Sequence, residues 1–335
     1  MSDPDAVLIV APNWLGDAVM ALPAIADVRR HFSSARLVVA ARPSVVDLFR
    51  MVSGVDTVLS AEPAPTRDAG ASIAILFPNS FASAWLMRRA CVPERWGYAS
   101  DLRSRLLTRA VRRPKAPMHQ GEYYQHLVRE LGIATGPLEL TLSIPAAALH
   151  DARALLAGRG WDDLSPLVVL APGAAYGKAK QWIPSHVVRL VTDLVRQRQF
   201  TCVLVGSRED AATTAAIRAA APDDCRSRIV DLAGATTLPA LAAVLSLSRA
   251  CVSNDSGAMH LAAAAGVPVV AIFGSTNERA TSPLTRAGRP AEVLTNPVWC
   301  RPCMLRECPI DHRCMTGIEP RRVLEAVDRV ADVKA

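Results

Sequence analysis

Residues 251–274 read CVSNDSGAMHLAAAAGVPVVAIFG, and this stretch decides the fold. It predicts the end of a strand, a polar loop, a short alanine-rich helix, a Gly-Val-Pro stop and a buried strand over 269–273. The loop at 253–257 is rich in residues that cap helix N-termini, so unpaired backbone N–H groups and the positive end of the helix dipole should meet there. Such a point suits the phosphates of a nucleotide, although an ordinary capped helix of an α/β protein shows the same pattern.

Apolar, β-branched runs alternate with helical patterns along the whole chain. The runs at 6–10, 36–40 and 73–77 predict buried parallel strands in the first half. The second half begins again with LVVLAP at 167–172, which repeats the VLIVAP of 7–12. The repeat predicts an α/β protein of two Rossmann-like domains, each built on a parallel sheet.

The domain boundaries follow from where this periodicity fades. Residues 134–150 contain Gly136-Pro137 and show little periodicity, so we place the link between the domains there. We therefore expect a first domain over 1–150 and a second domain over 160–318. We expect a final helix over 319–335 that packs back on the first domain.

The composition bounds the class of protein. The 335 residues carry a formal net charge of +7, half of them are hydrophobic, and eight are cysteines. No apolar run approaches the roughly 18–20 residues that span a bilayer, and the acidic N-terminus does not resemble a signal peptide. We therefore expect a cytoplasmic protein whose cysteines are thiols or metal ligands rather than disulfides.

Most of the positive charge lies in one segment, residues 88–115, which we call the basic segment. It has nine basic residues against two acidic ones, Glu94 and Asp101. The basic residues are Arg88, Arg89, Arg95, Arg103, Arg105, Arg109, Arg112, Arg113 and Lys115. They are not interleaved with stacking aromatic residues as in nucleic-acid-binding modules, so we expect no nucleic acid partner. The segment indicates either a phosphorylated or membrane-borne acidic partner or a solvated face.

Residues 172–182 form a second loop with phosphate-binding character. Lys178 and Lys180 put two ammonium groups just after a predicted parallel strand, at the sheet edge where open α/β sheets bind ligands. The loop is not the motif of P-loop ATPases, because only three residues separate its glycines and Ala179 replaces the required Ser or Thr. The two lysines would hold a diphosphate, or else they are solvated loop residues.

Two carboxylates follow predicted strands. Asp17 comes after the first strand and behind a glycine, where it could take a proton from an incoming hydroxyl or simply cap a helix. Asp231 ends a strand of the second half, where it could accept hydrogen bonds from a ribose diol or end the strand with no ligand.

Four motifs occur in order over nearly the whole chain. They are NWLGD at 13–17 with ALP at 21–23, FPNSF at 77–81, PG at 172–173 through AKQW at 179–182, and NDSG at 254–257 with MH at 259–260. Together they resemble the ADP-heptose:lipopolysaccharide heptosyltransferase family. The resemblance implies a GT-B fold, in which two Rossmann-like domains face each other across a cleft. It implies inverting, metal-independent transfer of L-glycero-D-manno-heptose from ADP-heptose to the inner-core heptose of Kdo-lipid A, with the protein peripheral on the inner face of the inner membrane.

The resemblance also implies roles for the residues at the matching positions. Asp17 becomes the general base, and Lys180 becomes the catalytic lysine on the diphosphate. The residues implied to bind the donor are Gly173, Lys178, Asp231, Asp255, Ser256, Gly257 and His260. The residues implied to bind the acceptor are Asn13, Trp14, Gly16, Asn79 and Ser80. One departure is Ile183, which separates Trp182 from Pro184 where the family runs Trp-Pro directly, and leaves the start of the following helix open.

Three alternatives stay open on the sequence. A related heptosyltransferase could use another core acceptor. A nucleotide-sugar epimerase of the same two-domain shape would turn over the donor without any acceptor. A non-catalytic scaffold at the membrane surface would use the same basic segment.

Four cysteines near the C-terminus form a separate motif. Cys300, Cys303, Cys308 and Cys314 follow a Cys-x2-Cys, x4-Cys, x5-Cys pattern, with His312 between the last two. This spacing is compatible with a structural zinc or iron–sulfur site, although the second pair lacks the tight spacing of zinc ribbons. A reduced cysteine-rich loop is the other interpretation, and we assign no catalytic metal.

Overall fold

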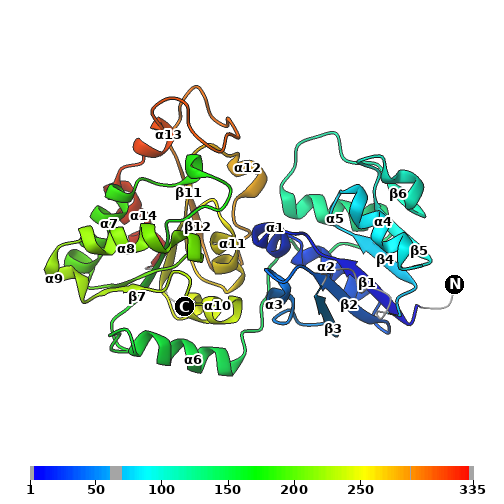
Figure 1. The fold of residues 1–335 in the computed structure, drawn as a ribbon, viewed down its shortest axis with the longest axis horizontal. Helices are drawn as coiled ribbons and strands as arrows, with labels where there is room; N and C mark the ends of the chain where they lie inside the picture. The colour runs from blue at the N-terminus through cyan, green and yellow to red at the C-terminus, as the bar shows by residue number, and fades with distance from the viewer. Residues whose placement is uncertain (1–3, 61–69, 287, 332–335) are drawn as a thin grey trace. The chain divides into compact units, whose positions relative to one another are not determined.

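The structure is a computed structural model that describes residues 4–60, 70–286 and 288–331. The chain divides into two compact units, Met1–Ser143 and Ile144–Ala335, and each unit is built on one six-stranded sheet (Figure 1). Every strand pair within the described residues is parallel. The predicted α/β fold with two Rossmann-like parallel sheets is therefore confirmed.

The first unit has the strand order β3-β2-β1-β4-β5-β6. Its strands are β1 (Ala6–Val10), β2 (Arg36–Ala41), β3 (Thr57–Ser60), β4 (Ile73–Leu76), β5 (Glu94–Tyr98) and β6 (Arg109–Val111). Its helices are α1 (Leu15–Met20), α2 (Leu22–His31), α3 (Val46–Phe49), α4 (Phe81–Arg89), the 3-10 turn η2 (Arg103–Leu106) and α5 (Gln120–Glu130). The central strands β1 and β4 are apolar along almost their whole length because helices bury both faces of the sheet.

The second unit has the strand order β12-β11-β10-β7-β8-β9. Its strands are β7 (Leu167–Ala171), β8 (Thr201–Leu204), β9 (Ile229–Asp231), β10 (Ala250–Asn254), β11 (Val269–Phe273) and β12 (Ala291–Thr295). Its helices are α6 (Ala146–Ala157), η3 (Lys178–Lys180), α7 (Pro184–Arg198), η4 (Arg208–Asp210), α8 (Ala211–Ala220), α9 (Asp223–Arg226), α10 (Leu238–Ser246), α11 (Gly257–Ala264), α12 (Glu278–Thr281), α13 (Arg313–Thr316) and α14 (Pro320–Ala331). The stretch that opened the sequence analysis is thus β10, α11 and β11 of this sheet.

Both sheets are wound in the same way. In each unit the first strand is central, the next two strands run out to one edge, and the fourth strand returns to the other side of the first. The order of strands therefore reverses between β1 and β4 in the first unit, and between β7 and β10 in the second. Ligands of doubly wound sheets bind beyond the carboxyl ends of the strands at such a reversal.

The two units meet in the chain between Ser143 and Ile144. The division after Ser143 falls inside 134–150, and α6 begins at Ala146 and packs against α10 in the second unit. Pro145 stands just before this helix, where its fixed φ and missing N–H are tolerated. The alanine-rich run that follows makes a helix where the sequence pattern had indicated only a linker.

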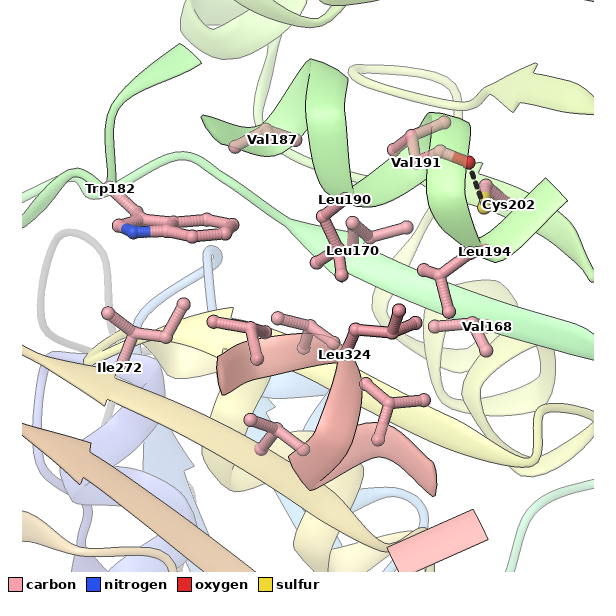
Figure 2. Packing of buried hydrophobic residues seen from close by; sticks show 14 of the residues in the cluster. Val168, Leu170, Trp182, Val187, Leu190, Val191, Leu194, Cys202, Ile272 and Leu324 are labelled. Carbon is pink, nitrogen blue, oxygen red and sulfur yellow. Dashed lines mark hydrogen bonds between the residues drawn. The ribbon is translucent and has the colours of Figure 1, made fainter. Parts of the chain in front are cut away.

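The core of the second unit lies between one face of its sheet and two helices, α7 and α14 (Figure 2). Leu190 and Leu194 of α7 pack over Leu170 of β7, and Leu324 of α14 joins the same cluster. Trp182 belongs to this core as well, and its indole N–H donates to the Ile318 carbonyl at 2.9 Å. The loop that carries Lys180 is therefore anchored in the core directly after its last lysine.

The C-terminal helix α14 uses its apolar face inside the second unit. Val323, Leu324, Val327 and Val330 are buried in the core that α14 shares with α7. The amphipathic helix therefore finds its hydrophobic partners on its own sheet, and its packing on the first domain stays a prediction. The predicted helix extended through 332–335, which lie outside the described residues.

Candidate active site

The ammonium group of Lys180 is held in place on the second unit. Its Nζ lies 2.7 Å from Oδ2 of Asp255, and the side chains of the two residues are only 15% and 7% exposed. The Thr276 hydroxyl donates to the same carboxylate oxygen at 2.7 Å. On its other side the ammonium lies 4.9 Å from the centre of the Tyr176 ring, within the range of a cation–π contact. Lys180 is therefore a fixed positive charge rather than a solvated loop lysine.

A side-chain clasp joins the loop after β7 to the end of β10. Asn254 donates from Nδ2 to the Pro172 carbonyl at 2.6 Å and accepts from the Trp182 backbone N–H at 3.1 Å. Since β7 and β10 are the neighbouring strands at the reversal of the sheet, the clasp fixes the lysine loop at the carboxyl ends of both.

The N-terminus of α11 lies at the end of the strand that supplies this clasp. Ser256 is the N-cap residue, and its side chain makes no capping hydrogen bond within the helix. Gly257 begins the helix, and His260 is buried in its first turns. Backbone N–H groups and the helix dipole therefore present positive potential close in sequence to Asp255, the partner of Lys180.

Gly173 packs closely against the side chain of Asp210. A Cβ atom added at residue 173 would lie 2.3 Å from the carboxylate of Asp210, which itself accepts from the Ser207 backbone N–H at 2.9 Å. Lys178, two residues before Lys180, is exposed at the start of η3. Of the two lysines in the loop, Lys180 is therefore the one that is largely buried and ion-paired with Asp255.

Asp231 lies apart from this group. It ends β9, which β8 separates from β7 in the sheet. Its carboxylate accepts from the backbone N–H of Ala233 at 3.1 Å, and within the described residues no hydrogen bond joins it to Lys180 or Asp255. Its assignment to the ribose stays a prediction.

In the first unit, the predicted base lies at the carboxyl end of the central strand β1. Asn13 and Trp14 are exposed, with 62% of Trp14 accessible, and Gly16 and Asp17 in the first turn of α1 are partly buried. The pKa of Tyr124 is raised well above its ordinary value, mainly by burial and also by the nearby charge of Asp17 and the hydrogen bond between the two side chains. Tyr124 of α5 is therefore a protonated donor beside the Asp17 carboxylate.

The loop after β4 carries Asn79 and Ser80 next to the same reversal. Asn79 donates from Nδ2 to the Tyr123 hydroxyl at 2.9 Å, while Ser80 caps α4 by accepting from the Ser83 backbone N–H. The guanidinium of Arg103 donates to backbone carbonyls of this loop, including that of Pro78, and to the Ser83 hydroxyl at 3.0 Å. The topology thus brings Asn13, Trp14, Gly16 and Asp17 to one end of the sheet with Asn79 and Ser80.

Arg103 belongs to the basic segment but is not part of an exposed basic face. Its side chain is fully buried, and this burial lowers the pKa of Arg103 to about 10. Arg95 also donates to carbonyl oxygens, including that of Leu106 at 2.7 Å. The remaining basic residues of the segment are exposed: Arg88, Arg89, Arg105, Arg109, Arg112, Arg113 and Lys115. A hollow of about 400 Å³ beside Arg109 and Arg112 contains none of the predicted site residues.

Several residues of the site were not predicted from the sequence. Thr276 lies in the loop that follows β11, so the rule that parallel strands present ligands at their carboxyl ends could have found it. Tyr124, Arg103 and Asp210 carry no local signal, because each reaches the site only through tertiary packing.

Within the part of the chain that the structure describes, no helix is both long and apolar enough to cross a membrane.

Comparison with known proteins places the chain among sugar transferases. The sequence profile of glycosyltransferase family 9 (heptosyltransferase) matches residues 67–313. Lipopolysaccharide heptosyltransferase 2 of Salmonella typhimurium is 28% identical over 339 residues, covering 95% of this chain and 96% of that protein. The solved structure of E. coli ADP-heptose lipopolysaccharide heptosyltransferase II matches with a TM-score of 0.83 at 26% identity, over 97% of this chain and 98% of that one. The iron-containing dodecameric glycosyltransferase TibC of enterotoxigenic E. coli shares the fold at 16% identity and a TM-score of 0.60, over 97% of this chain and 76% of that one.

Proposed function

Since this chain belongs to glycosyltransferase family 9, we propose that it transfers heptose from ADP-heptose to the lipopolysaccharide core. In this proposal the residues around Lys180 form the donor site. The chain is a heptosyltransferase. The acceptor that we propose is the inner-core heptose of Kdo-lipid A, because the motifs resemble heptosyltransferase II most closely and relatives of that name align over almost the whole chain.

The observation that carries the donor site is the buried ion pair of Lys180 and Asp255 at the reversal of the second sheet. The departing ADP gathers negative charge as the glycosidic bond breaks, and a fixed ammonium stabilises that charge without the cost of reorganising solvent. The N-terminus of α11 adds further positive potential for the same pyrophosphate. Because these groups supply the charge, we propose that the transfer step itself needs no metal ion.

In this proposal Asp17 is the general base. Inversion in a single step needs a group that takes the proton of the acceptor hydroxyl as the new bond forms. Asp17 is partly buried beside the protonated Tyr124, so a carboxylate with a fixed orientation is available at the end of β1. The base and the lysine belong to different units, so one turnover requires both units to hold the reacting sugars at the same time.

The transfer reaction is tested by supplying ADP-heptose with and without a heptose-terminated Kdo-lipid A acceptor. We expect ADP release and a heavier lipid product only when both substrates are present. Turnover of the donor alone would identify the epimerase instead, and transfer only to a different truncated core would identify a related heptosyltransferase with another acceptor. A scaffold without activity would show no stabilisation by ADP in a thermal-shift measurement.

For a lipid-anchored acceptor, we propose that the first unit docks on the anionic inner face of the membrane through an apolar patch. The patch consists of Phe81, Trp85, Leu86 and Leu102. The first three share the exposed face of α4, where the Phe81 and Trp85 rings stack with centroids 6.4 Å apart. Leu102 is 95% exposed on the neighbouring turn, which Asp101 ties to α4 by accepting from the Phe81 backbone N–H at 2.7 Å.

The charge around the apolar patch favours a membrane over a protein partner. Arg88 and Arg89 end α4, and Arg105 follows Leu102 in η2, so exposed guanidinium groups border the apolar side chains. Large apolar side chains next to cationic ones are typical of surfaces that lie in the headgroup layer of anionic bilayers.

Replacing Trp85 and Leu102 together with serine should weaken binding to phosphatidylglycerol-containing vesicles about tenfold or more, because each side chain loses apolar burial in the bilayer. Leu164→Ser is the matched control, since Leu164 of the second unit is 88% exposed but has no part in the patch. Vesicle co-sedimentation measures the effect, and raising the salt concentration should weaken vesicle binding more than ADP binding. Equal vesicle binding by the double variant and the control would contradict the docking surface.

A further inference from the structure

Residues 296–312, between β12 and α13, form a long segment that has neither regular secondary structure nor a buried apolar core of its own. The segment contains no helix or strand. Its large apolar side chains are exposed, among them Trp299 at 79%, Met304 at 53% and Ile310 at 52%. Loops of this length without secondary structure are uncommon unless they are functional or cross-linked. Burial of apolar side chains therefore does not explain the fold of this segment.

The four cysteines of the C-terminal motif converge on one point of this segment. Cys300, Cys303, Cys308 and Cys314 all line one cavity of about 20 Å³, together with His312. All four are free thiols. Cys308 Sγ accepts a hydrogen bond from the His312 backbone N–H at 3.3 Å, a contact of the kind that stabilises thiolate ligands in metal sites. Residues that span fifteen positions of sequence are thus gathered around a space the size of one ion.

We propose that these four cysteines hold one transition-metal ion, zinc or iron, in a tetrahedral thiolate site. In the conformation described, no three His, Cys, Asp or Glu side chains among the described residues stand close enough to hold an ion, so the thiols share a cavity without ligating. Binding an ion would draw the four sulfur atoms closer together around the cavity, and each thiol would release its proton to solvent as the metal–sulfur bond forms. Thiolate sites with four cysteines select zinc or iron, and the small cavity favours a single ion over a cluster.

The segment that the ion would close rests directly on the lysine loop. The Ala179 backbone N–H donates to the Arg306 carbonyl at 2.9 Å, and His312 Nε2 lies 2.9 Å from the Ala179 carbonyl. The Tyr176 hydroxyl donates to the Met304 carbonyl at 3.0 Å.

Gly177 allows this close approach. A Cβ atom added at residue 177 would lie 2.4 Å from the Arg306 carbonyl oxygen, so only a glycine fits there. The ion therefore acts as a positioning element for Lys180, a consequence that rests on the proposed donor site. The site depends on the thiols of this chain, and the likeness to TibC contributes only the fold.

Metal content tests the site independently of any activity. Protein purified under reducing conditions from medium supplemented with zinc and iron should contain about one equivalent of zinc or iron by elemental analysis, and the element found decides between the two ions. Cys303→Ser and Cys308→Ser should each lower the content below about 0.2 equivalents, because each removes one ligand. Both side chains are exposed and contribute little to the core, so both variants should still fold. Cys91→Ser is the matched control, an exposed cysteine of the first unit that should leave the content unchanged.

A second measurement tests the positioning role. In the two ligand variants, the shift in melting temperature produced by ADP should shrink several-fold, while Cys91→Ser keeps the full shift. Less than about 0.2 equivalents of metal in the unmodified protein would overturn the site, even if the protein is an active transferase. A full equivalent of metal with the same ADP shift in all three variants would overturn the positioning role and leave the proposed function intact.

Discussion

Asp17→Asn should reduce the turnover number of heptose transfer about a thousandfold, within the range that general base catalysis contributes to enzymes. Asparagine keeps the shape of the side chain and an oxygen that can accept from Tyr124, but it cannot take the proton of the acceptor hydroxyl. The stabilisation of the protein by ADP should stay unchanged, because the donor site belongs to the second unit. The measurement is steady-state transfer with both substrates, together with a thermal shift with ADP.

Asp47→Asn is the matched control for this experiment. Asp47 is also an acid in the first turn of a short helix of the first unit, but it pairs with Arg50 instead of lying at the reversal of the sheet. Its turnover number should remain within about twofold of the unmodified enzyme. Near-normal turnover in Asp17→Asn would show that another group removes the proton, and the assignment of the base would then be withdrawn.

Lys180→Ala should weaken ADP binding about a hundredfold, or about 2.8 kcal/mol at 1.4 kcal/mol per factor of ten. The lysine is the only cation of its loop that is built into the site, since it is held by Asp255 and Tyr176 within the described residues. Lys178→Ala, in the same loop but exposed, should cost no more than a few-fold. Isothermal titration with ADP measures both variants.

A loss of stability has to be separated from a loss of binding in this variant. Removing Lys180 leaves the mostly buried Asp255 carboxylate without its cation, which can destabilise a protein by about 3–5 kcal/mol. The double variant Lys180→Met with Asp255→Asn removes both charges, so its melting temperature should recover toward that of the unmodified protein while ADP binding stays weak. Recovery of both properties together would mean that Lys180 only supports the fold.

The fold was predictable because the central strands are buried on both faces. The runs at 6–10, 73–77 and 167–172 are apolar at almost every position, which marks parallel strands covered by helices. The strands β5, β6 and β12 were missed, since they are short, partly polar or only partly buried and their sequences lack that pattern. Helix α6 was missed because the prolines around it indicated a linker, and its burial against α10 shows only in the tertiary structure.

The site was predictable to the extent that it follows strand ends. Asp17, Asn79, Lys180 and Asp255 all lie in the segments that follow strands at the reversals of the two sheets. Strand ends indicated Asp17, the lysine loop and the loop before α11, whereas the family resemblance was needed to single out Asn79 and Lys180. The pairing of Lys180 with Asp255 is a contact across 75 positions, and the burial of Arg103 against the loop after β4 depends on tertiary packing. Sequence patterns carry no signal for such long-range contacts, which is why Arg103 was grouped with the exposed basic residues.

The clasp by Asn254 has a consequence for how tightly a nucleotide would be held. Ordering a free loop costs about 1–2 kcal/mol of conformational entropy for each residue fixed. The Pro172 and Trp182 ends of the lysine loop are already immobilised by hydrogen bonds to one amide side chain. That entropy is therefore lost when the protein folds. In the donor site that we propose, the loop would already be ordered when the pyrophosphate binds, so more of the interaction energy would be left to hold it.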